Sequence, residues 1–120
     1  MIGRIHERTI FRRLRREGST VRVGPLWCSV LLDSTLTQPH VAYALGRATG
    51  PAVVRNRLRR QLRAVMADVD RTSEVTPGWY LVGADAAAVS LSFSELSTRV
   101  PDLLNRAATK HTTRLGQVPR

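Results

Sequence analysis

The chain has 120 residues, of which 42% are hydrophobic, so it is long enough for one small domain with a modest core. Its formal net charge of +10 points to a polyanionic partner, and aromatic residues, at 5%, are too few for a binding sheet built on several stacking rings. The single cysteine excludes an internal disulfide and fits a reducing compartment, and the sequence has neither a signal-peptide pattern nor an apolar run of roughly 20 residues to span a membrane. We therefore expect a cytoplasmic protein with no membrane partner.

The first element predicted is a short helix at residues 9–17. Ile10, Phe11 and Leu14 lie on its inward face, and its outward face is rich in arginine. Gly18 follows, and a glycine can end a helix in the left-handed conformation at little cost. We expect the helix to stop there.

Alternating side chains predict three strands, at residues 26–32, 41–45 and 79–83. Successive side chains of a strand point to opposite faces, so Trp27 and Ser29 share one face of the first strand.

Between the second and third of these strands, residues 51–66 predict an amphipathic helix that fades near residues 68–70. Apolar side chains recur every three or four residues and form one stripe: Val54, Leu58, Leu62, Val65, Met66 and Val69. The opposite arc holds arginines and one asparagine, and one more arginine lies at the edge of the stripe: Arg57, Arg59, Arg60, Arg63 and Asn56, with Arg55 at the edge. No glutamate is interleaved, and arginine's planar fork suits bidentate contact with phosphate. We interpret this face as RNA- or DNA-binding rather than merely solvated.

Ser92 and Glu95 form a capping box that predicts the start of a last helix. Its apolar face is expected to hold Phe93, Leu96, Val100, Leu103 and Leu104. Pro101 should kink or restart this helix, since a proline removes a backbone hydrogen bond. Residues 109–120 are polar, basic and without periodicity, so we expect a flexible basic tail there, after a single domain at residues 1–108.

Motifs for protein-borne catalysis or metal binding are missing from the sequence. It has no P-loop, no GxGxxG motif, no zinc-ligand spacing and no dyad placed for nucleophilic or acid–base chemistry. The histidines share no spacing and are each expected at the surface: His6, His40 and His111. A small acidic group is interpreted as surface charge rather than a metal site: Asp68, Asp70 and Glu74. We predict no catalytic residue and no metal bound by the protein alone.

Residues 50–60 resemble the signature of the bacterial ribonuclease P protein subunit. The family pattern runs roughly G-N-A-V-x-R-N-R-[IL]-[KR]-R, and this chain departs from it at Pro51, where the family has asparagine. The resemblance covers about residues 4–107 and includes the first helix, where Phe11 and Gly18 match the family pattern.

The resemblance implies an α/β (α+β) fold, a compact single-domain sandwich in the order helix, three strands, helix, strand and helix, with a mixed sheet. The arginine-rich helix would form a left-handed crossover between parallel strands, against the usual right-handed rule. Because alternation alone predicts three strands, the fourth is expected near residues 20–24 or 35–39.

The resemblance also implies a function. The chain would be the RNA-binding subunit of ribonuclease P, in which a catalytic RNA removes the 5′ leader from precursor tRNA and Mg²⁺ is held mainly by RNA. Its partners would be the catalytic RNA and precursor tRNA, with no protein partner required. The residues expected to bind RNA are Arg55, Asn56, Arg57, Arg59, Arg60 and Arg63. Those expected to form a cleft for the leader are Phe11, Arg15, Trp27, Ser29 and Arg47. The family carries aromatic residues where this chain has Arg15 and Ser29, so Trp27 is expected to supply the stacking surface.

Three other functions compete with this one. A ribosomal or nucleoid-type module could use the same helix to bind RNA or DNA with no role in cleavage, but the asparagine between two arginines and the basic first helix argue against it. A membrane-surface helix would need exposed Trp, Phe or Leu on its apolar face. A self-sufficient protein nuclease would need a carboxylate cluster, which the sequence lacks.

Overall fold

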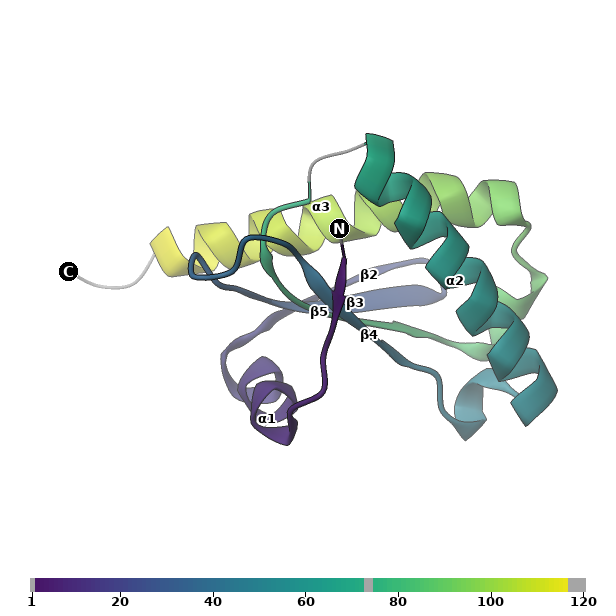
Figure 1. Ribbon diagram of the computed structural model, residues 1–120. Helices are drawn as coiled ribbons and strands as arrows, with labels where there is room; N and C mark the ends of the chain where they lie inside the picture. The colour runs from purple at the N-terminus through teal and green to yellow at the C-terminus, as the bar shows by residue number, and fades with distance from the viewer. Residues whose placement is uncertain (1, 73–74, 117–120) are drawn as a thin grey trace.

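The computed structural model describes residues 2–72 and 75–116, which form a five-stranded sheet with helices on both faces (Figure 1). The strands are β1 (Gly3–Arg4), β2 (Ser19–Val23), β3 (Leu26–Leu32), β4 (His40–Ala44) and β5 (Gly78–Ala84). The helices are α1 (Arg8–Glu17), α2 (Ala52–Thr72) and α3 (Phe93–Gly116), with short 3-10 helices η1 (Arg47–Thr49) and η2 (Ala86–Ser90). The long helices α2 and α3 cover one face of the sheet, and α1 packs on the other face.

The sheet, in the order β1-β4-β5-β3-β2, mixes parallel and antiparallel pairs as predicted. β1, β4 and β5 run parallel, while β3 is antiparallel to both β5 and β2. The chain passes from β4 through α2 to β5. In Figure 1, β4 and β5 both run towards the right, β4 lies nearer the viewer than β5, and α2 lies above the sheet, so this crossover is left-handed. β2 is the fourth strand, in the first of the two expected places, whereas β1 has only two residues and shows no alternation that could predict it.

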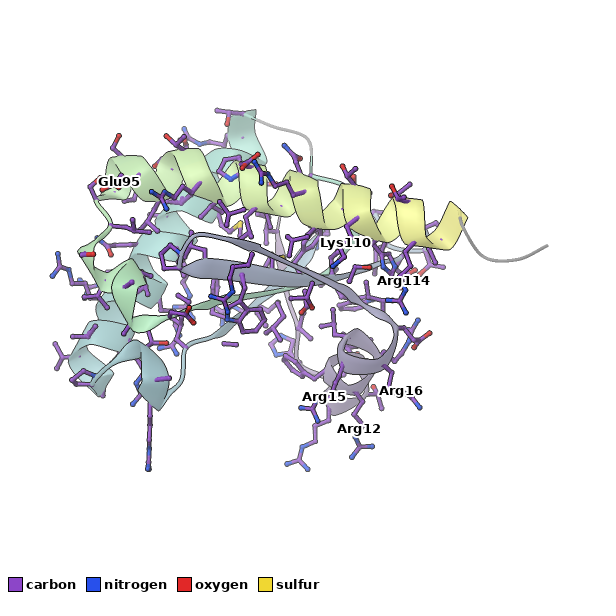
Figure 2. All side chains as sticks on the ribbon, turned by 180° about the vertical axis from the view of Figure 1, so that it is seen from behind. Arg12, Arg15, Arg16, Glu95, Lys110 and Arg114 are labelled. Atoms are coloured by element: carbon purple, nitrogen blue, oxygen red, sulfur yellow. The ribbon has the colours of Figure 1, made fainter. Side chains whose placement is uncertain are left out.

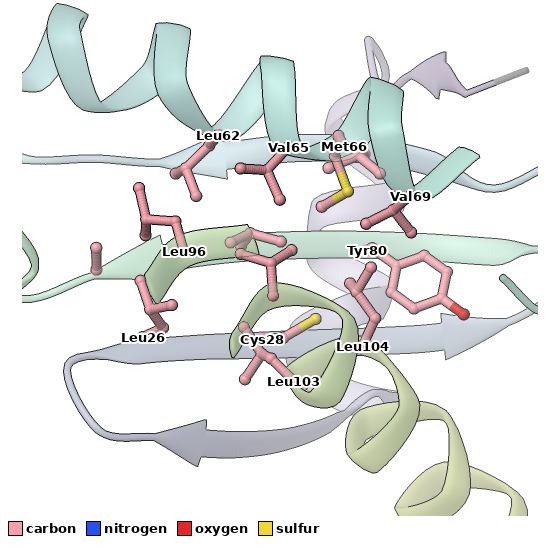
Figure 3. Packing of buried hydrophobic residues seen from close by; sticks show 14 of the residues in the cluster. Leu26, Cys28, Leu62, Val65, Met66, Val69, Tyr80, Leu96, Leu103 and Leu104 are labelled. Carbon is pink, nitrogen blue, oxygen red and sulfur yellow. The ribbon is translucent and has the colours of Figure 1, made fainter. Parts of the chain in front are cut away.

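The main core lies between the sheet and the α2–α3 layer (Figure 3). α2 buries the predicted stripe apart from Val54, which is half-buried. Its buried members are Leu58, Leu62, Val65, Met66 and Val69. The strand β3 contributes Leu26, Cys28 and Val30, so the predicted alternation is confirmed. A smaller core beneath α1 consists of Ile5, Ile10, Leu14 and Leu31.

Gly18 ends α1, but not for the predicted reason. Its φ of −73° is ordinary rather than left-handed. Its N–H donates a 3.0 Å hydrogen bond to the carbonyl of Leu14, and a Cβ on Gly18 would collide with that same oxygen. Glycine is therefore required here for a close approach of two backbone segments.

The start of α3 was predicted correctly, except for one side chain. The capping box is confirmed, because the Glu95 N–H donates to Ser92 Oγ at 3.0 Å and the Ser92 N–H donates to Glu95 Oε1 at 3.1 Å. Phe93, however, is 47% exposed, since the buried stripe begins one turn later at Leu96.

The remainder of α3 differs from the prediction. The helix does not restart at Pro101 but continues through it, and buried side chains lie on both sides of the proline: Leu96, Val100, Leu103 and Leu104. Residues 109–116, predicted as a flexible tail, extend the same helix. Residues 117–120 of that predicted tail lie outside the described residues.

Candidate nucleic-acid interface

Most of the arginine face of α2 is exposed. Asn56, Arg57, Arg60 and Arg63 are open to solvent, opposite the buried stripe. Arg59 is half-buried, and its Nη1 donates a 2.9 Å hydrogen bond to Asn56 Oδ1, which fixes both side chains on this face.

Arg55 is half-buried at the edge of the apolar stripe, where the sequence places it. Its Nε is buried and has no hydrogen-bond partner among the described residues. A buried donor without a partner is unusual, because desolvating it costs free energy.

The electrostatics of α2 change along its length. Between Arg55 and Arg63, the described structure contains no ion pair to an acidic side chain, whereas Arg71 in the last turn pairs with Asp68 at 2.6 Å. Like charges four residues apart, such as Arg55 and Arg59, repel each other by a few tenths of a kcal/mol. The first half of α2 thus carries concentrated positive charge that is not neutralised within the described protein.

A second surface lies on the opposite side of the sheet, where α1 crosses β3. A hollow of about 340 Å³ is lined by Phe11, Leu14, Arg15, Thr20, Trp27, Ser29 and Leu81. Four of the five residues predicted to form a cleft line this one hollow. We refer to it below as the leader cleft, after the function that the family resemblance implies for these residues.

Trp27 is half-buried in the leader cleft, and its indole ring lies over Gly83 of the neighbouring strand β5. A Cβ on Gly83 would overlap the ring atoms Cε2, Cζ2 and Nε1. Glycine at this position therefore allows the tryptophan to rest on the sheet, which accounts for a glycine inside a strand.

Ser29 lies beside Trp27 on the same face. Its hydroxyl forms a hydrogen bond with the hydroxyl of Thr20 in β2, with 2.6 Å between the two oxygens. Leu81 of β5 pairs directly with Ser29 and adds an apolar wall. Thr20, Leu81 and Gly83 are not predicted from the sequence, although a glycine inside a strand is a usable signal. Their placement follows from strand register, which the local pattern did not supply.

Arg47 is not among the residues that line the leader cleft. It is exposed in η1, between β4 and α2, and η1 is attached to β5 by a 2.8 Å hydrogen bond from Thr49 Oγ1 to the Ala84 carbonyl. The structure thus places Arg47 next to the start of α2, outside the lining of this hollow.

The end of α3 is hydrogen-bonded to the connection between α1 and β2 (Figure 2). Arg114 Nη1 donates to the carbonyls of Glu17 and Gly18 at 3.0 and 2.7 Å, and Lys110 Nζ donates to the Thr20 carbonyl at 2.7 Å. Cations at the C-terminal end of α1 also interact favourably with its dipole. These contacts hold the helix that forms one wall of the leader cleft.

His111 belongs to the same connection and is buried, so the prediction of a surface histidine is wrong there. Its Nδ1 lies 3.0 Å from Ser19 Oγ. Burial, and secondarily the nearby Arg114, lower the pKa of His111. Of the other two histidines, His6 is exposed, and His40 is half-buried with its ring centroid 4.8 Å from that of Trp79.

Groups suited to chemistry on the protein are few. Burial raises the pKa of the Cys28 thiol to about 12, so this thiol stays protonated at neutral pH. Within residues 2–72 and 75–116, no three His, Cys, Asp or Glu side chains are grouped to hold a metal ion. Asp68 is exposed, as predicted, while Glu74 lies outside the described residues.

Across the described part of the chain, no helix is both long and apolar enough to cross a membrane.

The chain matches the ribonuclease P family model over residues 3–108. It is 34% identical to the ribonuclease P protein component of Symbiobacterium thermophilum, a similarity that covers 87% of this chain and 90% of that protein. It is also 34% identical to the corresponding protein of Acidothermus cellulolyticus, with 86% of each chain covered.

Solved structures show the same fold. The RNase P protein of Staphylococcus aureus superposes with a TM-score of 0.75 at 18% identity and covers 87% of this chain and 94% of that one. The RNase P protein of Thermotoga maritima also gives a TM-score of 0.75, at 17% identity, and covers 86% of this chain and 96% of that one. This chain therefore belongs to the ribonuclease P protein component family, and it is the protein subunit that partners the ribonuclease P RNA in tRNA processing.

Proposed function

We propose that the arginine face of α2 binds the catalytic RNA of ribonuclease P while the leader cleft holds the 5′ leader of precursor tRNA. The observation that carries this proposal is the shared hollow of Phe11, Arg15, Trp27 and Ser29. An aromatic ring, a guanidinium and hydroxyls within one shallow cleft are the groups that bind single-stranded RNA, through stacking and phosphate contacts.

The two surfaces lie on opposite faces of the sheet, because α2 covers one face and the leader cleft opens on the other. One RNA segment on α2 leaves the cleft free for a second segment. This arrangement suits a subunit that joins a catalytic RNA to its substrate.

The role of the protein is electrostatic and positional. Arg57 and Arg60 neutralise phosphates of the catalytic RNA, and Trp27 with Arg15 holds the leader. We assign the Mg²⁺ of the reaction, and the chemistry itself, to the RNA, as the family resemblance implies. We also propose that the complex works in the cytoplasm without a further protein partner.

The proposal is tested by reconstitution. The protein is mixed with a ribonuclease P RNA and precursor tRNA at low Mg²⁺, and cleavage should be faster than with the RNA alone, since the protein supplies positive charge that Mg²⁺ otherwise provides. A ribosomal or nucleoid-type module would bind RNA but leave the cleavage rate unchanged.

Trp27→Ala is expected to weaken precursor tRNA binding to the assembled complex by roughly tenfold or more, because a stacked base contributes about 1–3 kcal/mol. Binding of mature tRNA, which has no leader, should hardly change. Equilibrium binding of both ligands measures the difference. Trp79→Ala makes the same chemical change outside the cleft and serves as the control. An equal loss for both ligands, or a large fall in the thermal stability of Trp27→Ala, would make Trp27 a structural residue.

No single carboxylate or histidine should be needed for the chemical step. Glu7→Gln, Asp68→Asn, Asp70→Asn and Asp85→Asn are each expected to cleave within a few-fold of the wild-type rate once the complex is saturated, since RNA performs the reaction. Single-turnover cleavage isolates that step. A loss of several orders of magnitude in any one of them, with binding intact, would show instead that the protein takes part in catalysis.

A further inference from the structure

The outer face of α1 carries a second concentration of arginine that the leader cleft does not account for. Arg8, Arg12, Arg15 and Arg16 are all exposed, and their spacing places them along one side of the helix, away from the buried Ile10 and Leu14. Figure 2 shows Arg12, Arg15 and Arg16 extending from α1 into solvent, away from the sheet.

This arrangement is unfavourable for the helix itself. Arg12 lies four residues from both Arg8 and Arg16, so each of these pairs brings like charges together. Arg8 also lies in the first turn, where positive charge opposes the helix dipole, and that turn contains no acidic residue. Only Arg13 of this helix has an ion pair within the described structure, to Glu17 at 3.1 Å. A solvated face would be more stable with glutamates interleaved, so the arginines fit a polyanionic ligand better.

The arginine surface of α1 is continuous with the leader cleft. A depression on the outside of the helix is lined by Arg12, Arg13, Arg15 and Arg16 together with Thr9, and Arg15 also lines the cleft. A single-stranded RNA that leaves the cleft past Arg15 therefore meets Arg12 and Arg16 next. The catalytic RNA is a less suitable ligand, because α2 and α1 lie on opposite faces of the sheet.

We propose that the outer face of α1 is a second phosphate-binding site, which takes the part of the precursor tRNA leader that extends beyond the cleft. Arg12 and Arg16 are its main contacts, and Arg15 joins it to the cleft. The contacts of this site are to phosphates, which carry no sequence information, so it measures leader length rather than leader sequence. This inference rests on the proposed function of the leader cleft.

The test compares two precursor tRNAs in the complex saturated with catalytic RNA. One has a short leader that fills only the cleft, and the other has a leader several nucleotides longer. With the wild-type protein, the longer leader should bind more tightly. In the double variant Arg12→Ala and Arg16→Ala, that gain should fall by roughly tenfold, and the log–log salt slope for the long leader should become shallower by about 0.7 for each phosphate that is no longer neutralised. Binding of the short leader should stay unchanged.

A matched control is the double variant Arg71→Ala and Arg106→Ala. It removes the same charge from α2 and α3, where each arginine pairs with a neighbouring aspartate, and it should keep the gain from the longer leader. Both doubles should fold normally, since the arginines are exposed and alanine favours a helix.

Three results would overturn the inference. The α1 double could weaken short and long leaders equally, the control double could lose the same gain, or the wild-type protein could show no gain from the longer leader. Stimulation of short-leader cleavage by the wild-type protein tests the proposed function separately, because that substrate does not reach the outer face of α1.

Discussion

Leu62→Ala should lower the free energy of unfolding by about 2–5 kcal/mol. The side chain is fully buried in the middle of α2, in the layer shared with Leu96 and the sheet (Figure 3). Truncation removes apolar packing and leaves a cavity that the surrounding helices and strands can close only in part. Denaturation with urea measures the loss, and an unchanged slope against denaturant would confirm that both states keep their compactness.

The control for this substitution is Val53→Ala on the same helix. Val53 is 80% exposed, so its truncation should change the free energy of unfolding by no more than about 0.5 kcal/mol. Similar losses for the two variants would mean that α2 is not packed on the sheet as the structure shows. The fraction of the Leu62→Ala protein that remains folded should still bind RNA, since the arginine face is on the other side of the helix.

Replacing Arg57 and Arg60 together by alanine should weaken RNA binding and leave stability unchanged, the opposite of the effect of Leu62→Ala. Both side chains are exposed, so thermal stability should hardly change. Binding to the catalytic RNA should weaken by roughly tenfold for each arginine, because a hydrogen bond to a charged group contributes about 1.5–3 kcal/mol. The log–log salt slope should become shallower by roughly one unit for each phosphate that the variant leaves without an arginine.

The double variant Arg71→Ala and Arg106→Ala is again the control. It removes the same net charge from other positions, so it shows whether the position of the arginines matters. It should leave the affinity for the catalytic RNA within a few-fold of wild type, as each of these arginines already neutralises an aspartate. If the Arg57–Arg60 double keeps the wild-type salt slope, those side chains are merely solvated and another surface binds the RNA.

Most of the fold could be predicted from local pattern. The period of the α2 stripe and the alternation of residues 26–32 are properties of consecutive residues, and both are confirmed. The capping box at Ser92 is also local, since its two hydrogen bonds span three residues. The hand of the crossover came from the family resemblance, because periodicity carries no information about handedness.

The parts that were missed depend on contacts between distant segments. The Trp27–Gly83 contact requires the register of β3 against β5, and the burial of His111 requires Ser19, which lies 92 residues away. Residues 109–116 lack an apolar period because polar hydrogen bonds, rather than a hydrophobic stripe, hold most of that segment. The role of Arg47 at the cleft stays a prediction, since this exposed residue lies in η1 and does not line the hollow.

The attachment of α3 to the α1–β2 connection sets an order of events during synthesis. The hydrogen bonds of Lys110 and Arg114 link residues that are 90 to 97 positions apart. Contacts of such long range form late, because the entropy of closing the loop must be overcome first. A chain that grows from its N-terminus makes α1 early, but the hydrogen bonds that tie the end of α1 to α3 form only after α3 has left the ribosome. The arginine-rich faces of α1 and α2 are thus synthesised before that attachment can form. Docking of α3 is therefore a late step, which completes the attachment of α1 to the rest of the fold.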